Sequence, residues 1–199
     1  MTRVAIIDSG GANIASLLYA FERLGATAEL TTDAEIIRRS PRVLLPGVGA
    51  ARNAMQRLQD AGLVDVIRNL TQPVLGICLG MQLLCDASEE DDVECLGIVP
   101  GIAKRLPVAD DYPVPNMGWC ATTSTSPHPL LAGIDDGSYF YYVHSYAVPV
   151  SENTLATARH TAAFSAVIGK ENFVAAQFHP ERSSKAGARL LQNFLDIPA

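Results

Sequence analysis

A cysteine between two glycines gives the first indication of chemistry in this sequence. Gly76, Cys78 and Gly80 form the pattern G-x-C-x-G, between an apolar run and a segment with helical spacing. In a nucleophile elbow, the reactive residue sits on a sharp strand-to-helix turn, and the glycines leave room for that turn to close. The amides and dipole at the start of the helix favour the thiolate over the thiol. The pattern predicts Cys78 as a nucleophile; the alternative is a small buried core residue.

A histidine and a glutamate lie two positions apart near the end of the chain, in the segment Q-F-H-P-E over 177–181. In extended backbone a period of two places the side chains of His179 and Glu181 on one face, and Pro180 keeps His179 out of the helical region. A carboxylate beside an imidazole selects its tautomer and stabilises its protonated form. We therefore expect His179 as the base for Cys78 and Glu181 as the orienting acid. The alternative is a surface loop in which both side chains face water.

A glycine-rich segment, P-G-V-G over 46–49, follows another apolar run. Open α/β folds place their ligands beyond the carboxyl ends of the strands, where such a loop would lie. Acyl transfer needs two donors at the developing oxyanion, and glycines can turn a backbone N–H inward. We expect the amides of Val48 and Leu79 to form this oxyanion hole. The alternative is a simple turn between a strand and a helix.

Apolar periodicity predicts the scaffold that would bring these motifs together. Apolar runs at 4–7, 43–45 and 74–77 are typical of buried strands, and a further strand is expected over 26–30. Helices are expected over 13–24, 51–61 and 79–87. Strands that alternate with helices predict right-handed crossovers and a mostly parallel sheet covered on both faces.

The second half of the chain has shorter apolar segments, separated by prolines and glycines. Shorter strands, some antiparallel, are expected over 98–106, 139–143, 146–150, 155–158, 164–168 and 173–178, followed by a helix over 184–194. No internal repeat, low-complexity tract or linker is evident in the sequence. We therefore predict one α/β domain over residues 1–199.

Composition narrows the class of protein. The chain has 199 residues, of which 48% are hydrophobic and 18% charged, so it can bury a sizeable core. A net charge of −6 gives no overall attraction to nucleic acid. The sequence has neither a signal-peptide core nor an apolar run of membrane-spanning length, so we expect a cytoplasmic protein with reduced cysteines and no membrane association.

Two kinds of cofactor site do not fit the sequence. His128, His144 and His160 lack the spacing of metal ligands, so no metal is expected. Gly10 and Gly11 follow the first predicted strand, but the spacing G-x-G-x-x-G of a dinucleotide site is absent from the sequence. No cofactor is therefore expected.

Taken together, the motifs resemble the class I (triad-type) glutamine amidotransferases, which share the elbow and the H-P-E segment. P-G-V-G, N-M-G-W over 116–119 and V-H-S-Y over 143–146 narrow the resemblance to the glutaminase subunits of imidazole glycerol phosphate synthase, an enzyme of histidine biosynthesis. The match runs nearly end to end. It implies a flavodoxin-like fold, with a mostly parallel sheet and extra antiparallel strands, and hydrolysis of glutamine to glutamate and ammonia by Cys78, His179 and Glu181.

The resemblance also implies a substrate site and a partner. By position, it assigns glutamine binding to Gly49, Gln82, Glu90, Ser145 and Tyr146. It implies a heterodimer with a (βα)8-barrel cyclase that receives ammonia through an internal channel, because ammonia released into water would be protonated. Five residues match positions near that interface: Asn13, Met117, Trp119, Tyr141 and Arg182. For Met117 and Trp119 the alternative is core packing.

Four positions depart from the usual pattern of this family. Ser9 stands in place of tyrosine, Ala12 of glycine, Cys120 of asparagine and Arg182 of lysine. We expect all four on or near the partner face. An amidotransferase of pyridoxal phosphate or anthranilate synthesis remains an alternative, as does a cysteine peptidase or thiol stress protein of related fold. An intact triad argues against a catalytically silent scaffold.

Overall fold

A nine-stranded sheet runs through the centre of the structure, a computed structural model that describes residues 2–10 and 13–198. In spatial order the strands are β2 (Thr27–Thr31), β1 (Arg3–Ile7), β3 (Arg42–Gly47), β4 (Val74–Cys78), β13 (Phe173–Ala176), β12 (Ala163–Lys170), β11 (Thr154–Arg159), β8 (Asn116–Ser124) and β9 (Ser138–His144). The first five are parallel to one another, and each later pair of neighbours, beginning with β13 and β12, is antiparallel.

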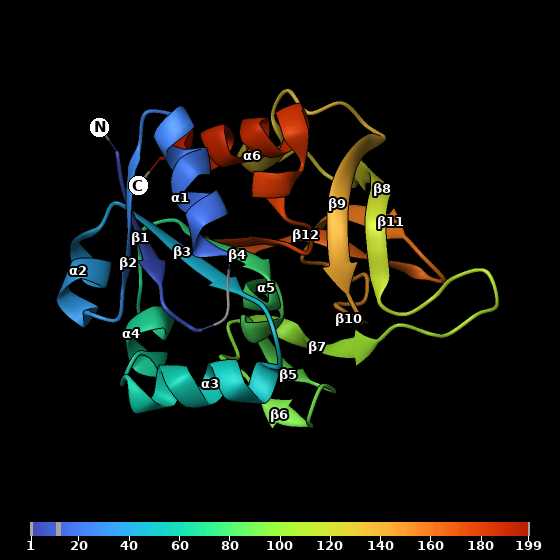
Figure 1. The fold of residues 1–199 in the computed structure, drawn as a ribbon, viewed down its shortest axis with the longest axis horizontal. Coiled ribbons are helices and arrows are strands. Elements are labelled where there is room, and N and C mark those ends of the chain that lie inside the picture. The colour runs from blue at the N-terminus through green and yellow to red at the C-terminus, as the bar shows by residue number, and fades with distance from the viewer. Residues whose placement is uncertain (1, 11–12, 199) are drawn as a thin grey trace.

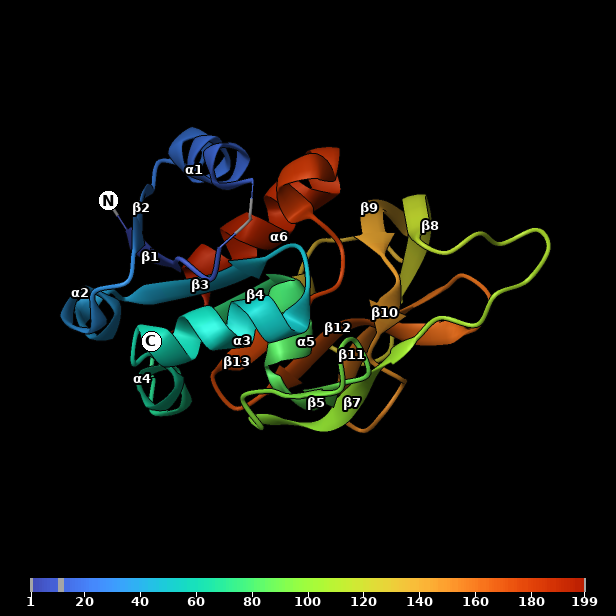
Figure 2. The ribbon, with the colours of Figure 1, turned by 60° about the horizontal axis from the view of Figure 1, so that its bottom comes forward.

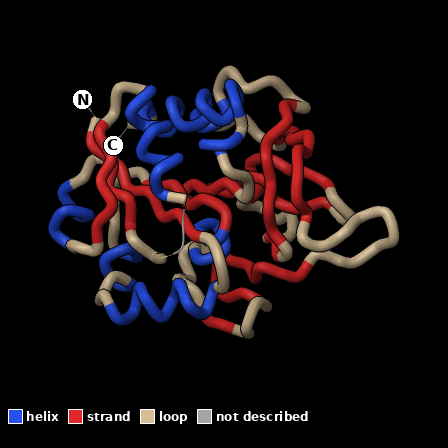
Figure 3. The backbone as a smooth tube through the Cα atoms, viewed as in Figure 1, coloured by secondary structure: helices blue, strands red, loops and turns tan. Residues whose placement is uncertain are grey.

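Helices cover both faces of the parallel half of this sheet (Figure 1 and Figure 3). One face carries α1 (Ile14–Arg23) and α6 (Ser184–Asp196), and the other carries α3 (Ala51–Asp60), α4 (Val64–Arg68) and α5 (Leu79–Leu83). The apolar residues of β1 alternate between two core clusters: Val4 and Ile6 pack towards α1 and α6, while Ala5 and Ile7 pack towards α3. This double coverage explains why the parallel strands are continuous apolar runs.

A second, four-stranded sheet lies beside α5 (Figure 2). Its order is β10 (Tyr146–Ala147), β7 (Val99–Arg105), β5 (Cys85–Ser88) and β6 (Val93–Glu94). The remaining elements are α2 (Ala34–Arg39) and two short 3-10 helices, η1 (Pro129–Leu131) and η2 (Pro180–Arg182). No helix in the described part of the chain is long and apolar enough to span a membrane.

Two neighbouring strands bring the predicted reactive residues to one edge of the sheet. β4 ends at Cys78, and β13 pairs with it in parallel, with Ala176 opposite Ile77. The chain therefore leaves β13 towards His179 at the same edge at which β4 turns into α5. The sheet order, rather than closeness in sequence, places Cys78 near His179.

The α/β fold and the strands predicted in the first half are confirmed, but several elements differ from the prediction. The helix predicted over 79–87 ends at Leu83, and Cys85–Ser88 forms β5 instead. The amide of Gly97 donates to the carbonyl of Cys85, and β5 pairs with β7, so sheet pairing replaces further helical turns. Helices α2 and α4 and strand β8 were not predicted, because each lacks a long apolar period.

Candidate active site

A cavity of about 390 Å³ lies at the edge of the sheet where β4 and β13 end. Its wall contains Cys78, His179 and Glu181, all three predicted catalytic residues. It also contains the other predicted residues of the oxyanion hole and the substrate site, namely Val48, Leu79, Gly49, Gln82, Glu90, Ser145 and Tyr146. A larger groove of about 560 Å³ is lined by residues 124–132, none of which belongs to the predicted site.

The turn at Cys78 is strained, as the elbow pattern predicts. Cys78 has φ +54° and ψ −110°, a conformation rarely adopted by a residue with a side chain. A Cβ at Gly80 would lie 1.7 Å from the carbonyl oxygen of Leu45, so only glycine lets α5 approach β3 this closely. A Cβ at Gly76 would lie 3.0 Å from backbone atoms of Gly80. Both glycines of the pattern are therefore required by packing.

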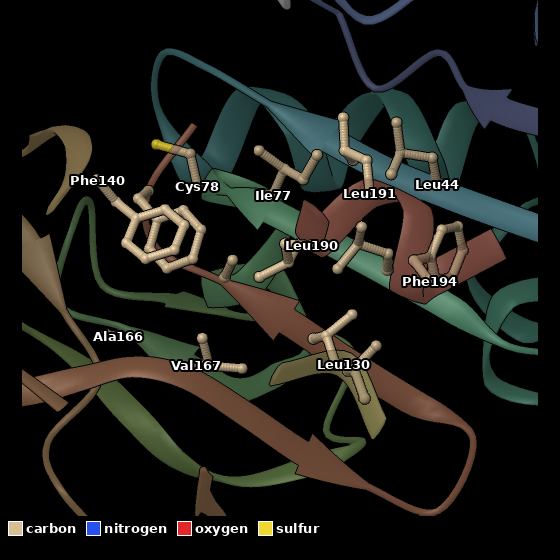
Figure 4. Close-up of a cluster of buried hydrophobic side chains, with 14 of the residues drawn as sticks. Leu44, Ile77, Cys78, Leu130, Phe140, Ala166, Val167, Leu190, Leu191 and Phe194 are labelled. Atoms are coloured by element: carbon tan, nitrogen blue, oxygen red, sulfur yellow. The ribbon is translucent and has the colours of Figure 1, made fainter. Parts of the chain in front are cut away.

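Cys78 is buried at the edge of an apolar cluster, and Figure 4 shows its sulfur pointing away from Ile77. The thiol donates to the carbonyl oxygen of Val143 at 3.6 Å. The side-chain amide of Gln177 donates to the same sulfur at 3.8 Å. The sulfur thus lies between a group that favours the thiol and a group that favours the thiolate.

His179 and Glu181 form a buried pair. Nδ1 of His179 lies 2.9 Å from Oε1 of Glu181, and because a carboxylate only accepts, Nδ1 carries the proton. The Glu181 side chain is 3% exposed, and its Oε2 has no hydrogen-bond partner among the described residues. Burial alone lowers the pKa of His179, but interactions with Cys78 and Glu181 outweigh it and raise the pKa to about 10. A protonated imidazole beside the sulfur is the electrostatic state that stabilises a thiolate.

Gln82 and Gln177 form a hydrogen-bonded chain that ends on the sulfur. Nε2 of Gln82 donates to the carbonyl oxygen of Tyr146 at 3.0 Å and to Oε1 of Gln177 at 3.2 Å. Because that carbonyl only accepts, it fixes the orientation of the Gln82 amide, which in turn directs the Gln177 amide nitrogen at Cys78. Gln177 is fully buried and was not assigned a role from the sequence. Its place in the Q-F-H-P-E segment was the available signal.

The P-G-V-G loop is held at both ends. The buried hydroxyl of Ser9 donates to the carbonyl oxygen of Pro46 at 2.6 Å. Oε2 of Glu90 accepts the amide of Ala51, at the start of α3, at 2.9 Å. Burial and the charge of Asp91 raise the pKa of Glu90, against the lowering effect of that amide. Between these supports, Gly49 has φ +91°, and Val48 and Gly49 line the cavity.

His144 also lines the cavity but is a structural histidine in a fixed neutral form. Its Nδ1 lies 2.9 Å from the carbonyl oxygen of Tyr146 and must donate to it, so its Nε2 accepts from the side-chain amide of Asn116 at 3.0 Å. Burial, with smaller contributions from His160 and His179, lowers its pKa to about 4. The segments N-M-G-W and V-H-S-Y are therefore joined through this pair.

The five residues predicted near a partner lie on an exposed patch or in the cavity wall, and Arg182 belongs to both. Met117 and Trp119 are 64% and 51% exposed on the outer side of β8, so the core-packing alternative is wrong for both. Trp119 contacts Tyr141 edge to face, and the Arg182 guanidinium lies 4.3 Å from the centre of the Tyr141 ring. Asn13 and Arg182 also line the cavity. An exposed aromatic patch thus adjoins the mouth of the cavity.

Two of the four unusual positions do not lie on this patch as expected. Ser9 is buried beneath the P-G-V-G loop. Cys120 packs against the core with its sulfur 3.6 Å from Oδ1 of Asn116, because alternation along β8 turns it away from Trp119. Arg182 lies at the patch. Ala12 falls outside the described residues, as does Gly11.

Curated proteins similar to this chain are named as subunits of one enzyme. This chain is 50% identical to "Imidazole glycerol phosphate synthase subunit HisH" of Xanthomonas axonopodis pv. citri (strain 306), over 99% of this chain and 98% of that protein. It is 48% identical to the subunit HisH of Xylella fastidiosa (strain Temecula1 / ATCC 700964) over the full length of both chains.

Solved structures support the fold. A putative GMP synthase subunit from Thermoplasma acidophilum has a TM-score of 0.75 at 17% identity, covering 99% of this chain and 94% of that one. A structure described as a glutamine amidotransferase has the same TM-score and identity, covering 97% of each chain. The family model "Glutamine amidotransferase class-I" matches residues 5–197. This chain therefore belongs to the class I glutamine amidotransferases.

Proposed function

We propose that this chain is the glutaminase subunit of an imidazole glycerol phosphate synthase and supplies ammonia from glutamine to a cyclase subunit. The full-length identity of 48–50% to proteins named as that subunit supports the assignment. The observation that carries the chemistry is the convergence of Cys78, His179 and Glu181 on one cavity. Conversion of the amide to an acid and ammonia needs a nucleophile, a proton carrier and an orienting group, and these three residues supply them.

The first half of the reaction forms a thioester. The Cys78 thiolate attacks the side-chain carboxamide carbon of glutamine, and the carbonyl oxygen becomes an oxyanion. The amides of Val48 and Leu79, both in the cavity wall beside Cys78, would hold it. Protonated His179 gives its proton to the departing nitrogen, which leaves as ammonia. The carbon–sulfur bond forms on attack, and the carbon–nitrogen bond breaks afterwards, when the oxyanion collapses to the thioester.

The second half returns the enzyme to its starting state. Neutral His179 removes a proton from water, and the resulting hydroxide attacks the thioester carbon. The carbon–sulfur bond breaks, so glutamate and the Cys78 thiolate are released beside a protonated imidazole. Glu181 keeps the ring in one tautomer throughout, because its carboxylate accepts the Nδ1 proton at 2.9 Å.

The opposite wall of the cavity suits the polar end of glutamine. Glu90 offers a carboxylate to the ammonium group, with one oxygen already fixed by the amide of Ala51. Gln82, Ser145, Tyr146 and Gly49 supply polar and backbone groups around it. The Gln82 amide is pre-oriented by Tyr146 and Gln177, which reduces the entropy lost on binding.

The exposed patch of Met117, Trp119, Tyr141 and Arg182 is the proposed docking surface for the (βα)8-barrel cyclase. Large exposed aromatic side chains and arginine are enriched at protein interfaces. Asn13 and Arg182 belong to the cavity wall as well. A partner on this patch would therefore cover the mouth of the cavity and receive ammonia before water protonates it.

Glutamine hydrolysis and product synthesis by the complex with the cyclase test this proposal. Cys78→Ala is expected to lower glutamine-dependent turnover by about 10⁴-fold or more, because no other group replaces the nucleophile. Synthesis driven by added ammonium should stay at the wild-type rate. Cys120→Ala is the matched control, since Cys120 is half-buried on β8 and does not line the cavity.

Two outcomes would contradict the assignment. Loss of ammonium-driven synthesis in Cys78→Ala would mean that the chain does more than supply ammonia. Stimulation of glutamine hydrolysis by an anthranilate or pyridoxal phosphate synthase partner, with none by the cyclase and its ribonucleotide ligand, would place the chain in another pathway.

A further inference from the structure

Ser183 stands at the start of α6 but does not cap it. A serine at this position usually accepts an amide of the first helical turn, yet no such side-chain bond is present in the described helix. Its hydroxyl instead donates to the carbonyl oxygen of His179 at 2.6 Å and accepts the backbone amide of Tyr141 at 3.0 Å. The residue is 1% exposed, so both bonds are shielded from water.

The start of α6 is distorted in a way that suits these bonds. Ser183 has φ −106° and ψ 32°, outside the extended region from which a capping side chain reaches its helix. Ser184 has φ +52°, a left-handed conformation that is unfavourable for a residue with a side chain. A Cβ at Gly187 would lie 2.0 Å from the carbonyl oxygen of Pro180, so the helix packs directly on the H-P-E segment. The first turn of α6 therefore lacks a stabilising cap where the helix packs on the H-P-E segment.

Hydrogen bonds connect the backbone of His179 to one residue of β9, Tyr141. Its amide donates to the carbonyl oxygen of Tyr141 at 2.9 Å. Its carbonyl oxygen accepts the Ser183 hydroxyl, which in turn accepts the amide of the same Tyr141, and it also accepts the amide of Arg182 at 3.0 Å. With Glu181 on Nδ1, the backbone is fixed on both sides and the ring is fixed at one nitrogen.

We propose that Ser183 is a positioning residue, whose hydroxyl fixes the backbone of His179 to Tyr141 and thereby aims the imidazole at the sulfur and the leaving nitrogen. The inference rests on the proposed function, in which His179 carries the proton. Tyr141 also carries Arg182 over its ring and contacts Trp119. One residue of β9 therefore joins the proposed docking surface to the backbone of His179.

The test compares three variants in complex with the cyclase. Ser183→Ala removes both hydrogen bonds, and we expect kcat for glutamine hydrolysis to fall about 10- to 100-fold, as displaced catalytic groups do, with KM nearly unchanged. Ser183→Asp discriminates between roles, because aspartate caps helices as well as serine but would direct a carboxylate at the His179 carbonyl. It should be no more active than Ser183→Ala. Ser184→Ala, at an exposed neighbouring serine, should match the wild type.

Wild-type kcat in Ser183→Ala would overturn the proposal. So would recovery of kcat in Ser183→Asp, since that result assigns the serine to helix capping. Thermal unfolding of the same samples ensures that each variant is assayed well below its transition.

A second readout needs no glutamine and so separates this proposal from the proposed function. The rate of iodoacetamide labelling of Cys78 at one fixed pH is followed by mass spectrometry of its peptide. In Ser183→Ala this rate should fall, because a displaced His179 activates the sulfur less. Ser184→Ala should keep the wild-type rate. An unchanged rate in Ser183→Ala would overturn the positioning role, even if the wild type proved unable to hydrolyse glutamine.

Discussion

Cys78 and His179, the two proposed catalytic side chains, are held in different ways. Cys78 is placed by packing: its backbone is strained at φ +54°, and Gly80 brings α5 against the carbonyl of Leu45. His179 has ordinary extended backbone and is placed by hydrogen bonds at its amide, its carbonyl and its ring. Packing fixes a position within a narrow range, whereas hydrogen bonds can be exchanged one at a time. Substitutions around Cys78 should therefore affect folding and activity together, and substitutions around His179 should lower activity more than they lower stability.

The largest effect is expected at Gly80. In Gly80→Ala the new Cβ would overlap the Leu45 carbonyl, and we expect a loss of unfolding free energy of about 3 kcal/mol or more, with loss of activity. Denaturant unfolding measures it. Gly62→Ala is the control: Gly62 has φ +67° but no atom within 4 Å of a built Cβ, so it should cost only about 1–2 kcal/mol. Equal losses would show that packing is not what places Cys78.

Glu181→Gln should separate activity from stability. The amide can still accept the Nδ1 proton but carries no charge to stabilise the imidazolium, so we expect kcat to fall about 10²- to 10⁴-fold. The loss of unfolding free energy should be smaller than in Gly80→Ala. Steady-state kinetics measure the first quantity and calorimetry the second. Glu22→Gln, on the exposed side of α1, serves as the control, and a wild-type kcat in Glu181→Gln would remove the carboxylate from the mechanism.

Gln177 lies in the same segment as His179 and donates to the Cys78 sulfur, so its loss should have an intermediate effect. Gln177→Leu fills the same space but removes the donor to the Cys78 sulfur and the acceptor of Gln82. We expect kcat/KM to fall about 10-fold, as for one hydrogen bond of roughly 1.5 kcal/mol. Steady-state kinetics measure this change in kcat/KM. Gln59→Leu, at an exposed position, is the control. Wild-type kcat/KM would mean that Gln177 has no part in the reaction.

The last comparison concerns two histidines whose pKa values move in opposite directions. Folding lowers the pKa of His144 from 6.5 to about 4, so between these values the unfolded chain binds a proton that the folded chain does not. The stability of the fold therefore decreases as pH falls from 6.5 to about 4. Folding raises the pKa of His179 from 6.5 to about 10. The contribution of His179 to stability is therefore full below pH 6.5 and is lost as pH rises to about 10.

Thermal unfolding at pH 5, 7 and 9 checks both signs. His144→Gln should flatten the acid side of the stability profile, and His179→Gln should flatten the alkaline side. The reverse pattern, or unchanged profiles in both variants, would contradict these assignments.

Much of this site could be predicted from local sequence because its key residues carry steric or spacing constraints. Gly76 and Gly80 are explained by contacts within a few residues of Cys78 or with an adjacent strand. His179 and Glu181 share a face because only Pro180 separates them. The parallel strands were predictable because burial on both sides makes them continuous apolar runs.

What could not be predicted depends on contacts between distant segments. Ser183 looks like a helix cap in the sequence, and only the approach of Tyr141 changes its use. Ser9 was expected on or near the partner face, but the P-G-V-G loop covers it. Strand β8 was missed because its outer side carries exposed Met117 and Trp119 while its inner side carries Asn116 and Gly118, so no apolar alternation is visible.

The parallel pairing of β4 with β13 also constrains when activity can arise during synthesis. Gln177 and Cys78 are 99 positions apart, although their strands are neighbours. A chain still growing on the ribosome can complete the elbow long before the second strand has been made. Its thiol then has no proton acceptor, so the nascent protein is unable to waste glutamine. Competence for hydrolysis arrives only after His179 and Glu181 have been synthesised.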